Sequence, residues 1–366
     1  MLTKASGKII IKLKFQILEE MRGLNMATIR EIAKACDVSI ATVSNILNHK
    51  GKVSEKTRQM VLEQVERMNY VPNVVARNLK CRETRMIGII TEDLTVFNAP
   101  EIVDGIDDYL EEQDYNFVLG NLRIYKKYGN DFSYHEEFKK HLDEEIAMMR
   151  AKQVEGIIYV SAHSRDLSEM LEQDANVPIV VVYGFADKKE IPSIVFDDEK
   201  AADAVVSCLL KDKAVSLGII AGEKNSVHTI DRLLGCQKAL FRSGVLFNPE
   251  LVYYGDWSRK FGYEAAEQLL GKHVNVIFSM NDSMAAGVYD YARDQNLTIG
   301  KDIFIGGIGN KIGDVLRPRL TTVEMPLFEM GRRAGEQILE LISGQKMSCE
   351  KSKLKGTLQN EKGGSA

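Results

Sequence analysis

The side chains whose types and spacing point to a chemical role lie in a short helical stretch near the N-terminus. Val43, Ile46 and Leu47 share one face of a helix over residues 40–47. At or beside the opposite face lie Ile40, Ala41, Thr42, Ser44, Asn45 and Asn48. Residues 1–85 hold 16 Lys/Arg against 8 Asp/Glu, a net charge of +8, whereas the rest of the chain carries −12. A basic head of this kind indicates nucleic-acid binding, and the alternative is a solvated, charge-rich helical head.

Motifs for catalysis or metal binding are missing from the sequence. The six histidines show no H-E-x-x-H spacing, and there is neither a G-x-S-x-G motif nor a P-loop. The segment Gly307-Ile-Gly309-Asn-Lys-Ile312 lacks the third glycine of a dinucleotide-binding fingerprint. We therefore predict a protein that is not an enzyme and that holds no cofactor and no metal.

Length, composition and cysteine usage bound the class of protein. The 366 residues predict two or three domains, and 45% hydrophobic with 27% charged residues is typical of a globular protein. The five cysteines are far apart and form no C-x-x-C pair. The apolar stretch from Ile9 to Ile17 is interrupted by Lys12 and Lys14. These features predict a cytoplasmic protein without membrane contact.

Three short helices must position the polar face described above. Thr28 is a candidate N-cap with Glu31 at the capping-box position, and the first helix should end near Cys36 and Asp37. Ser39 can cap a second helix and Ser54 a third that runs to about Met68. Inward-facing residues of the third helix are predicted to be Val61, Leu62 and Val65. A tight turn between the first two helices predicts a helix-turn-helix bundle over residues 26–71.

The first 25 residues show no clear period, so we expect a non-native or disordered extension before Met26. After a linker at residues 72–85, apolar runs alternate with helical stretches over residues 86–345. The runs are Met86–Ile90, Phe117–Leu119, Gly156–Val160, Ile179–Val182, Val215–Ile220, Val276–Phe278 and Ile303–Ile305. This alternation predicts α/β architecture, with two doubly wound parallel-sheet subdomains separated by a cleft.

Several segments in order carry a family resemblance. They are Ala27 to Asn48, Val53 to Arg58, Asn69 to Asn73, Ala76 to Leu79, Ile87-Gly88, Gly156 to Ile158, Gly262 to Ala266, Asn281-Asp282 and Leu320 to Val323. With these segments the chain resembles the lac repressor family of bacterial transcription regulators over about residues 26–345. The segment Val96 to Ile102 resembles galactose- or galactoside-responsive regulators.

The resemblance implies that the second helix enters the DNA major groove. Ile40 and Ala41 would contact thymine methyl groups, and Asn45 would hydrogen-bond a base edge where many relatives carry Arg. Phosphate contacts are expected from Thr28, Ser39, Thr42, Ser44 and Asn48. In relatives the linker folds into a hinge helix on DNA. The DNA contacts expected from this segment are Asn73, the minor-groove wedge Leu79, and Lys80, which lies beside the phosphates.

For the body, the resemblance implies a periplasmic-binding-protein-like fold with a small effector between the subdomains. Asn98 and Arg232 match ligand positions of the family. Asn281 and Asp282 follow the strand Val276–Phe278, where a carboxylate can accept from two sugar hydroxyls. Trp257, the only tryptophan, would cover the apolar face of a sugar ring. The alternative for Trp257 is a structural loop residue. Many relatives carry Asp where this chain has Tyr183 and Gly309, and Asn310 is a candidate substitute for the second of these.

Together these features predict a repressor of sugar metabolism genes, controlled by a sugar-like effector. Its partners would be a pseudo-palindromic operator and a second copy of itself. The tail at residues 346–366 has no leucine heptads, which predicts a homodimer without tetramers. A phosphoprotein corepressor in place of a free sugar is the alternative form of control. A transport binding protein would share the body but lack the head.

Overall fold

The computed structural model describes residues 28–47, 53–70, 84–128, 135–174, 176–188, 190–211, 216–309, 312–345 and 351–360. The chain divides into two compact units, residues 1–83 and residues 84–366. No helix in these ranges is long and apolar enough to cross a membrane.

The first unit contains three helices, α2 (Ile29–Ala35), α3 (Ile40–Leu47) and α4 (Glu55–Arg67). All three predicted caps are present: Thr28 and Glu31 form a capping box, Ser39 accepts from the amide of Thr42 at 3.0 Å, and Ser54 accepts from that of Thr57 at 3.2 Å. The small core contains Ile32, Val43, Ile46 and Val61. These caps and this core hold α3 against its neighbours.

One inward-facing residue was predicted wrongly. Leu62 is 42% exposed, whereas Val61 is fully buried. Successive residues on a helix point about 100° apart, so a face that buries Val61 and packs Val65 turns Leu62 outward.

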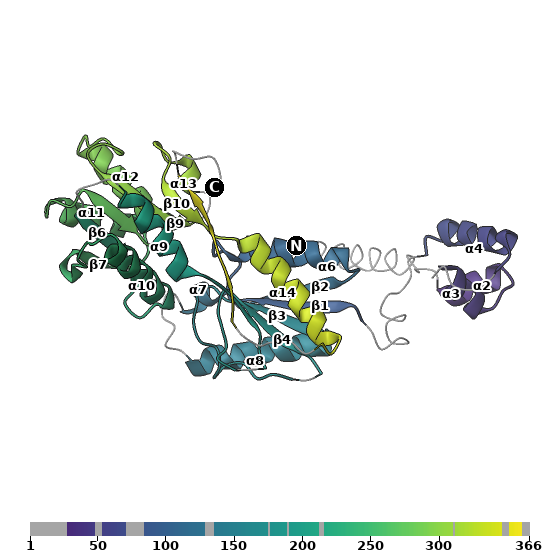
Figure 1. Cartoon of the computed structure of the whole chain (residues 1–366). Helices are drawn as coiled ribbons and strands as arrows, with labels where there is room; N and C mark the ends of the chain where they lie inside the picture. The colour runs from purple at the N-terminus through teal and green to yellow at the C-terminus, as the bar shows by residue number, and fades with distance from the viewer. Residues whose placement is uncertain are drawn as a thin grey trace, which may run out of the picture. The chain divides into compact units, whose positions relative to one another are not determined.

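The second unit contains two six-stranded sheets (Figure 1). The first sheet has the order β11-β5-β4-β3-β1-β2, with every strand parallel to its neighbours. Its strands are β1 (Met86–Thr91), β2 (Asn116–Asn121), β3 (Gly156–Val160), β4 (Ile179–Val182), β5 (Ser193–Phe196) and β11 (Ser352–Leu354). The second sheet has the order β12-β10-β9-β8-β6-β7 and is parallel except for β12. Its strands are β6 (Leu217–Ala221), β7 (Val252–Tyr254), β8 (Val276–Ser279), β9 (Phe304–Gly309), β10 (Thr321–Glu324) and β12 (Thr357–Gln359). The predicted fold class is confirmed.

Helices cover both sheets. Those of the first sheet are α6 (Ala99–Glu112), α7 (Ile124–Tyr128), α8 (His135–Ala151) and α14 (Leu327–Ile342). Those of the second are α9 (Asp198–Leu209), α10 (Val227–Arg242), α11 (Arg259–Leu270), α12 (Asp282–Asp294) and α13 (Ile312–Val315), with a 3-10 turn at Pro249–Leu251. Ile87 and Ile89 of β1 belong to the core with α6, whereas Ile90 belongs to the core with α8. This alternation is what a strand covered on both faces requires.

The chain crosses between the two sheets three times. The first crossing leads from β5 to α9, which packs on α10 and β9, and the second leads from β10 to α14, which packs on α6 and β3. The third leads from β11 to β12. Residues 351–360, expected to be a tail beyond the body, thus add one edge strand to each sheet.

Candidate functional site

The outward face of α3 has the side chains expected to read DNA. Ile40 is 45% exposed, and Ala41 and Asn45 are also exposed, while Val43 and Ile46 are buried in the core. Thr42 and Ser44 are partly buried. Ile40, Ala41 and Asn45 therefore lie together on the open side of the bundle.

The residues expected to contact DNA phosphates also have polar contacts within the protein. The hydroxyl of Thr28 lies 3.0 Å from a Glu31 carboxylate oxygen, and that of Ser39 lies 2.8 Å from the Thr42 hydroxyl. Thr28 and Ser39 are exposed and could reach a partner beyond these contacts. The predicted contacts Asn48, Asn73, Leu79 and Lys80 lie outside the described residues.

A cleft of about 430 Å³ opens at the carboxyl ends of the strands of both sheets. We call it the inner chamber, and every residue in its wall follows a strand, as expected for ligand sites in open α/β sheets. The first sheet contributes Thr95, Val96, Phe97, Tyr125, His163 and Tyr183, and the second contributes His228, Arg232, Trp257, Asn281 and Ser283, with Met325 at the second crossing.

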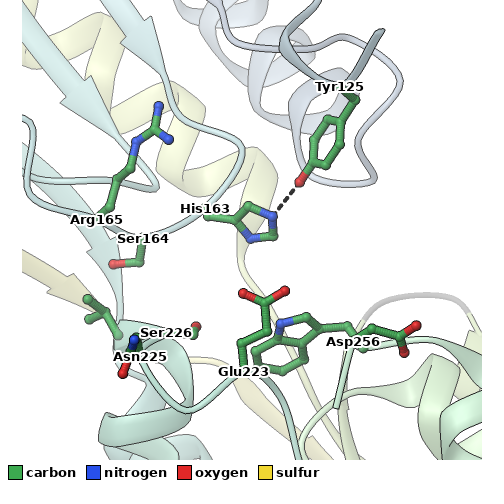
Figure 2. Close-up of a pocket in the computed structure, with 10 residues that line it drawn as sticks. Tyr125, His163, Ser164, Arg165, Glu223, Asn225, Ser226 and Asp256 are labelled. Atoms are coloured by element: carbon green, nitrogen blue, oxygen red, sulfur yellow. Dashed lines mark hydrogen bonds between the residues drawn. The ribbon is translucent and has the colours of Figure 1, made fainter. Parts of the chain in front are cut away.

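Tyr125 and His163 form one side of the cleft. The Tyr125 hydroxyl contacts Nε2 of His163, and both side chains face the loops that carry Glu223 and Asp256 (Figure 2). Burial, together with the nearby His228 and Arg165, lowers the pKa of His163 to about 3. His163 is therefore neutral at physiological pH.

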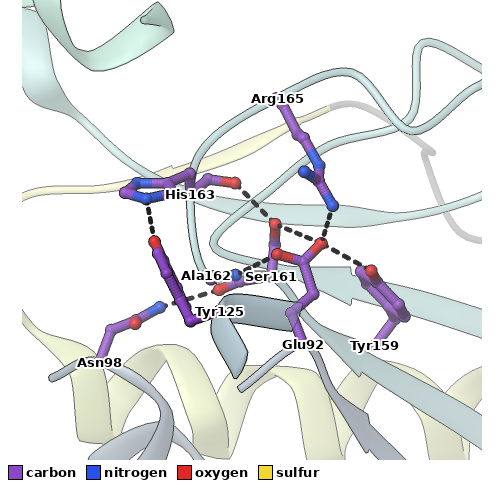
Figure 3. Close-up of polar contacts among 8 residues, drawn as sticks. All are labelled: Glu92, Asn98, Tyr125, Tyr159, Ser161, Ala162, His163 and Arg165. Carbon is purple, nitrogen blue, oxygen red and sulfur yellow. Dashed lines mark hydrogen bonds and ion pairs between the residues drawn. The ribbon is translucent and has the colours of Figure 1, made fainter. Parts of the chain in front are cut away.

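A buried carboxylate anchors the loop that carries His163. Glu92, at the end of β1, accepts from the Tyr159 hydroxyl at 2.6 Å and from the backbone amide of Ala162 at 2.8 Å (Figure 3). It also pairs with the Arg165 guanidinium. Because Glu92 is fully buried, these partners must compensate its charge, and they fix the cleft-facing loop in return.

A second buried carboxylate holds the opposite wall. Asp198, at the start of α9, accepts from Nε of Arg232 at 2.6 Å and contacts Nδ1 of His228 at 2.7 Å. The amide of Ser164 donates to Nε2 of His228 at 3.2 Å, so a neutral His228 carries its proton on Nδ1 and donates it to Asp198. Burial alone would raise the pKa of Asp198, but His228 and Arg232 hold it below its usual value. The charge of Arg232 is thereby balanced inside the wall.

A hydrogen bond to its backbone positions Trp257, and the absence of a side chain at Gly222 leaves room for its ring. Its carbonyl accepts from the side-chain amide of Asn281 at 3.0 Å, while Asn281 also caps α12. A side chain at Gly222 would lie 1.9 Å from the indole carbon Cζ2, so only glycine leaves room for the ring. The Arg232 guanidinium lies 5.8 Å from the ring centre.

Four predicted effector residues line the inner chamber, namely Tyr183, Arg232, Trp257 and Asn281. Tyr183 contacts Phe97 and His228 through its ring, and its hydroxyl lies 3.7 Å from the sulfur of Met325. Burial raises the pKa of Tyr183, which therefore stays protonated.

Two other predicted residues lie behind the wall. Asn98 is fully buried and donates to the carbonyl of Ser161 at 2.9 Å. Asp282 accepts from the Thr322 hydroxyl at 2.8 Å, and a side chain at Gly309 would lie 2.7 Å from its carboxyl carbon. The Asp282 carboxylate thus fills the room that an Asp at position 309 would need. Asn310 lies outside the described residues.

Four residues of the cleft wall were not predicted from the sequence, namely Phe97, Tyr125, His163 and His228. Each follows a strand that meets the cleft, and that position is the signal that could have found them. The Glu92 network has no local signal, because its partners are about 70 residues away.

Comparisons with known proteins match both units. Residues 28–73 match the model of bacterial regulatory proteins of the lacI family, and residues 84–362 match that of periplasmic binding proteins and the sugar binding domain of the LacI family. The chain is 31% identical over 327 residues to the HTH-type transcriptional regulator RegA of Clostridium saccharobutylicum, covering 88% of this chain and 95% of RegA. It is 31% identical over 308 residues to catabolite control protein A of Priestia megaterium, covering 83% and 89%.

Solved structures agree over the whole fold. The lac repressor dimer bound to operator and the anti-inducer ONPF matches with a TM-score of 0.75 at 25% identity, covering 92% of this chain and 98% of that one. The complex of the regulator CelR with cellobiose matches with a TM-score of 0.63 at 23% identity, covering 91% and 98%, which supports the fold alone.

Proposed function

The chain belongs to the lacI family of bacterial regulatory proteins, and from this membership we propose a repressor of sugar metabolism genes whose effector is a neutral sugar held in the inner chamber. Membership makes it a DNA-binding transcription regulator with an effector-binding body, and not an enzyme. Our proposal goes beyond this membership in two respects: the effector is a neutral sugar, and the protein represses transcription.

The composition of the inner chamber is the observation that carries the sugar. A pyranose ring has an apolar face, which suits the indole of Trp257 and the exposed ring of Phe97. Its hydroxyl edge needs donors and acceptors, which Tyr125 offers from the first sheet and Asn281 and Ser283 offer from the second. Asn98 lies behind the wall of the first sheet, and Asp282 lies behind that of the second.

Charge balance favours a neutral ligand over a sugar phosphate. The two arginines nearest the cleft are each paired with a buried carboxylate, Arg232 with Asp198 and Arg165 with Glu92. His163 is neutral at physiological pH. An anionic phosphate would therefore have to share an arginine whose charge already neutralises a buried carboxylate, which leaves the charge of the phosphate poorly compensated in the cleft.

Among neutral sugars, galactose and galactosides are the first candidates, because residues 96–102 resemble regulators that respond to them. The names of the relatives RegA and catabolite control protein A mention no sugar, so they do not help to choose among neutral sugars.

For the head, we propose that Ile40, Ala41 and Asn45 contact base edges while Thr28, Ser39, Thr42, Ser44 and Asn48 contact phosphates. In the linker, Leu79 would wedge into the minor groove beside Asn73 and Lys80. The protein would act in the cytoplasm as a homodimer on a pseudo-palindromic operator. The lac repressor, a relative in fold at 25% identity, is a dimer on its operator.

The test is titration calorimetry of the full chain with neutral sugars and their phosphate esters, followed by operator binding with each ligand that binds. We expect a neutral sugar to bind and to change operator affinity. Tight binding of sugar phosphates alone would contradict the proposal. An operator affinity that responds to a phosphoprotein and to no sugar would instead support the corepressor alternative.

A further inference from the structure

A second cavity adjoins the inner chamber, and binding of a single sugar ring in the inner chamber leaves it without a role. This outer chamber measures about 440 Å³ and shares Tyr125, His163 and Trp257 with the inner one. The rest of its wall comes from the loops after β3, β6 and β7 (Figure 2). The two cavities therefore adjoin at these three side chains.

The wall of the outer chamber has more polar surface than that of the inner chamber. Ser164, Asn225 and Ser226 offer hydroxyl and amide groups, while Glu223 and Asp256 add two carboxylates. Val227 is the one aliphatic residue among those in the described wall. A hydroxyl-rich ring matches this wall, whereas an apolar aryl group would leave its polar groups without partners.

The charge of the outer chamber excludes anions more strongly than that of the inner one. Glu223 and Asp256 are exposed, and the side-chain hydroxyl and then the backbone amide of Ser258 lower the pKa of Asp256, which keeps it ionised. The positive charge of Arg165 is committed to Glu92. Carboxylates accept strong hydrogen bonds from sugar hydroxyls and repel phosphates.

Each chamber lies near the lower end of the roughly 300–1,000 Å³ typical of small-molecule sites. Two such spaces in series, with aromatic side chains between them, suit two linked rings better than one. Trp257, in the wall of both, can cover the apolar face of a ring beside the linkage.

We propose that the effector is a neutral disaccharide, with one ring in the inner chamber and the second ring in the outer chamber. This inference rests on the proposed function and narrows it to a class of ligand. Glu223, Asn225 and Asp256 then set specificity for the second ring.

The test is titration calorimetry of the full-length protein with lactose, melibiose, cellobiose, maltose and sucrose, their component monosaccharides, a nitrophenyl glycoside and a sugar 6-phosphate. We expect at least one disaccharide to bind at least tenfold more tightly than either of its monosaccharides. The nitrophenyl glycoside should gain little over the monosaccharide, and the phosphate should bind weakly.

A variant that fills the outer chamber makes the test specific. Asn225→Trp should reduce the affinity of that disaccharide to the level of the monosaccharide, while retained operator binding shows that the protein is folded. Gln268→Trp, on the exposed side of α11, adds the same side chain away from the cleft and should keep the wild-type preference.

The outcomes separate the two proposals. If a monosaccharide binds as tightly as every disaccharide, or if Asn225→Trp keeps the disaccharide affinity, the two-ring inference is overturned and the sugar-responsive repressor stands. If only the 6-phosphate binds, or no sugar in the panel binds, both are overturned.

Discussion

At the scale of single residues, the cleft is organised by groups that touch no ligand. Glu92 and Asp198 are buried carboxylates whose partners end in the cleft wall, so each holds a loop or a guanidinium in place. Removing one partner of such a pair leaves a buried charge uncompensated, which is why substitutions there would damage folding as well as binding. Informative substitutions are therefore those that leave both pairs intact.

Asn45→Ala should relax base preference at one position in each operator half-site. The loss of a base contact costs about 1 to 3 kcal/mol, while weak binding to other sequences survives through the phosphates. Selection of bound sequences from a random pool measures this preference. Gln59→Ala, exposed on α4, is the control. An equal loss of affinity for all sequences would argue against base reading by Asn45.

Gly222→Ala should displace the Trp257 indole and weaken sugar binding roughly tenfold, the order of one lost aromatic contact. Because Trp257 is the only tryptophan, its fluorescence reports the cleft without interference. The emission change on adding sugar should disappear in this variant. Gly271→Ala, whose added carbon would make ordinary contacts, should behave as wild type. An intact emission change in Gly222→Ala would show that the ring is held in some other way.

His163 should make stability depend on pH. Its pKa is lowered from 6.5 to about 3, so the unfolded chain takes up a proton between these values that the folded protein does not. Its contribution is complete above pH 6.5 and is lost as the pH falls toward 3, by roughly 1 to 2 kcal/mol between pH 7 and 5. Urea unfolding of wild type and His163→Gln measures this. The variant should show a shallower slope with pH, and equal slopes would refute the assignment.

At the scale of elements, apolar runs in the sequence predicted the strands that are buried on both faces. β3 and β4 begin and end at the predicted residues, because strands buried on both faces are continuous apolar runs. β5, β7 and β10 were not predicted, since each is three or four residues long and the first and last mix Ser or Thr with apolar residues.

Residues of the site could likewise be predicted only where a local or family pattern marks them. Arg232 and Trp257 could be named because they match a family pattern, and Asn281 also caps a helix beside them. Tyr125 and His163 are 38 residues apart in sequence and meet only in the folded chain, so no spacing predicts them as a pair. Asp282 follows a strand as a cleft residue would, but its carboxylate accepts from the Thr322 hydroxyl, a contact 40 residues away that no spacing predicts.

The terminal strands should be needed for a stable body. Deleting residues 351–366 removes β11 and β12, with the partly buried Leu354 and Leu358, and we expect a loss of about 2 to 4 kcal/mol together with aggregation at the exposed edges. Deleting only residues 361–366 is the control. Thermal unfolding compares the two deletion variants, and equal stability would show that the two edge strands contribute little.

Sedimentation of the variant that lacks only residues 361–366 should give a dimer.

At the scale of the whole molecule, effector and operator must affect each other equally. A ligand shifts DNA affinity only by the ratio of its own affinities for the two states of the protein, so operator DNA must change sugar affinity by the same factor. Calorimetric titration of the sugar with and without operator measures this factor. Trp257→Ala, which leaves both buried ion pairs intact, should weaken sugar binding and keep operator binding. Equal sugar affinity for free and operator-bound wild type would rule out the coupling.

The three crossings between the sheets lie side by side. The amide of Asp197, at the first, donates to the carbonyl of Leu354 at 2.9 Å, and a side chain at Gly356 would lie 2.4 Å from the carbonyl oxygen of Glu324 and 3.1 Å from the ring of Phe196. Three adjacent segments of backbone link the two halves of the body. We expect such a link to bend more easily than it twists, so that the two halves move mainly by changing the opening angle of the cleft.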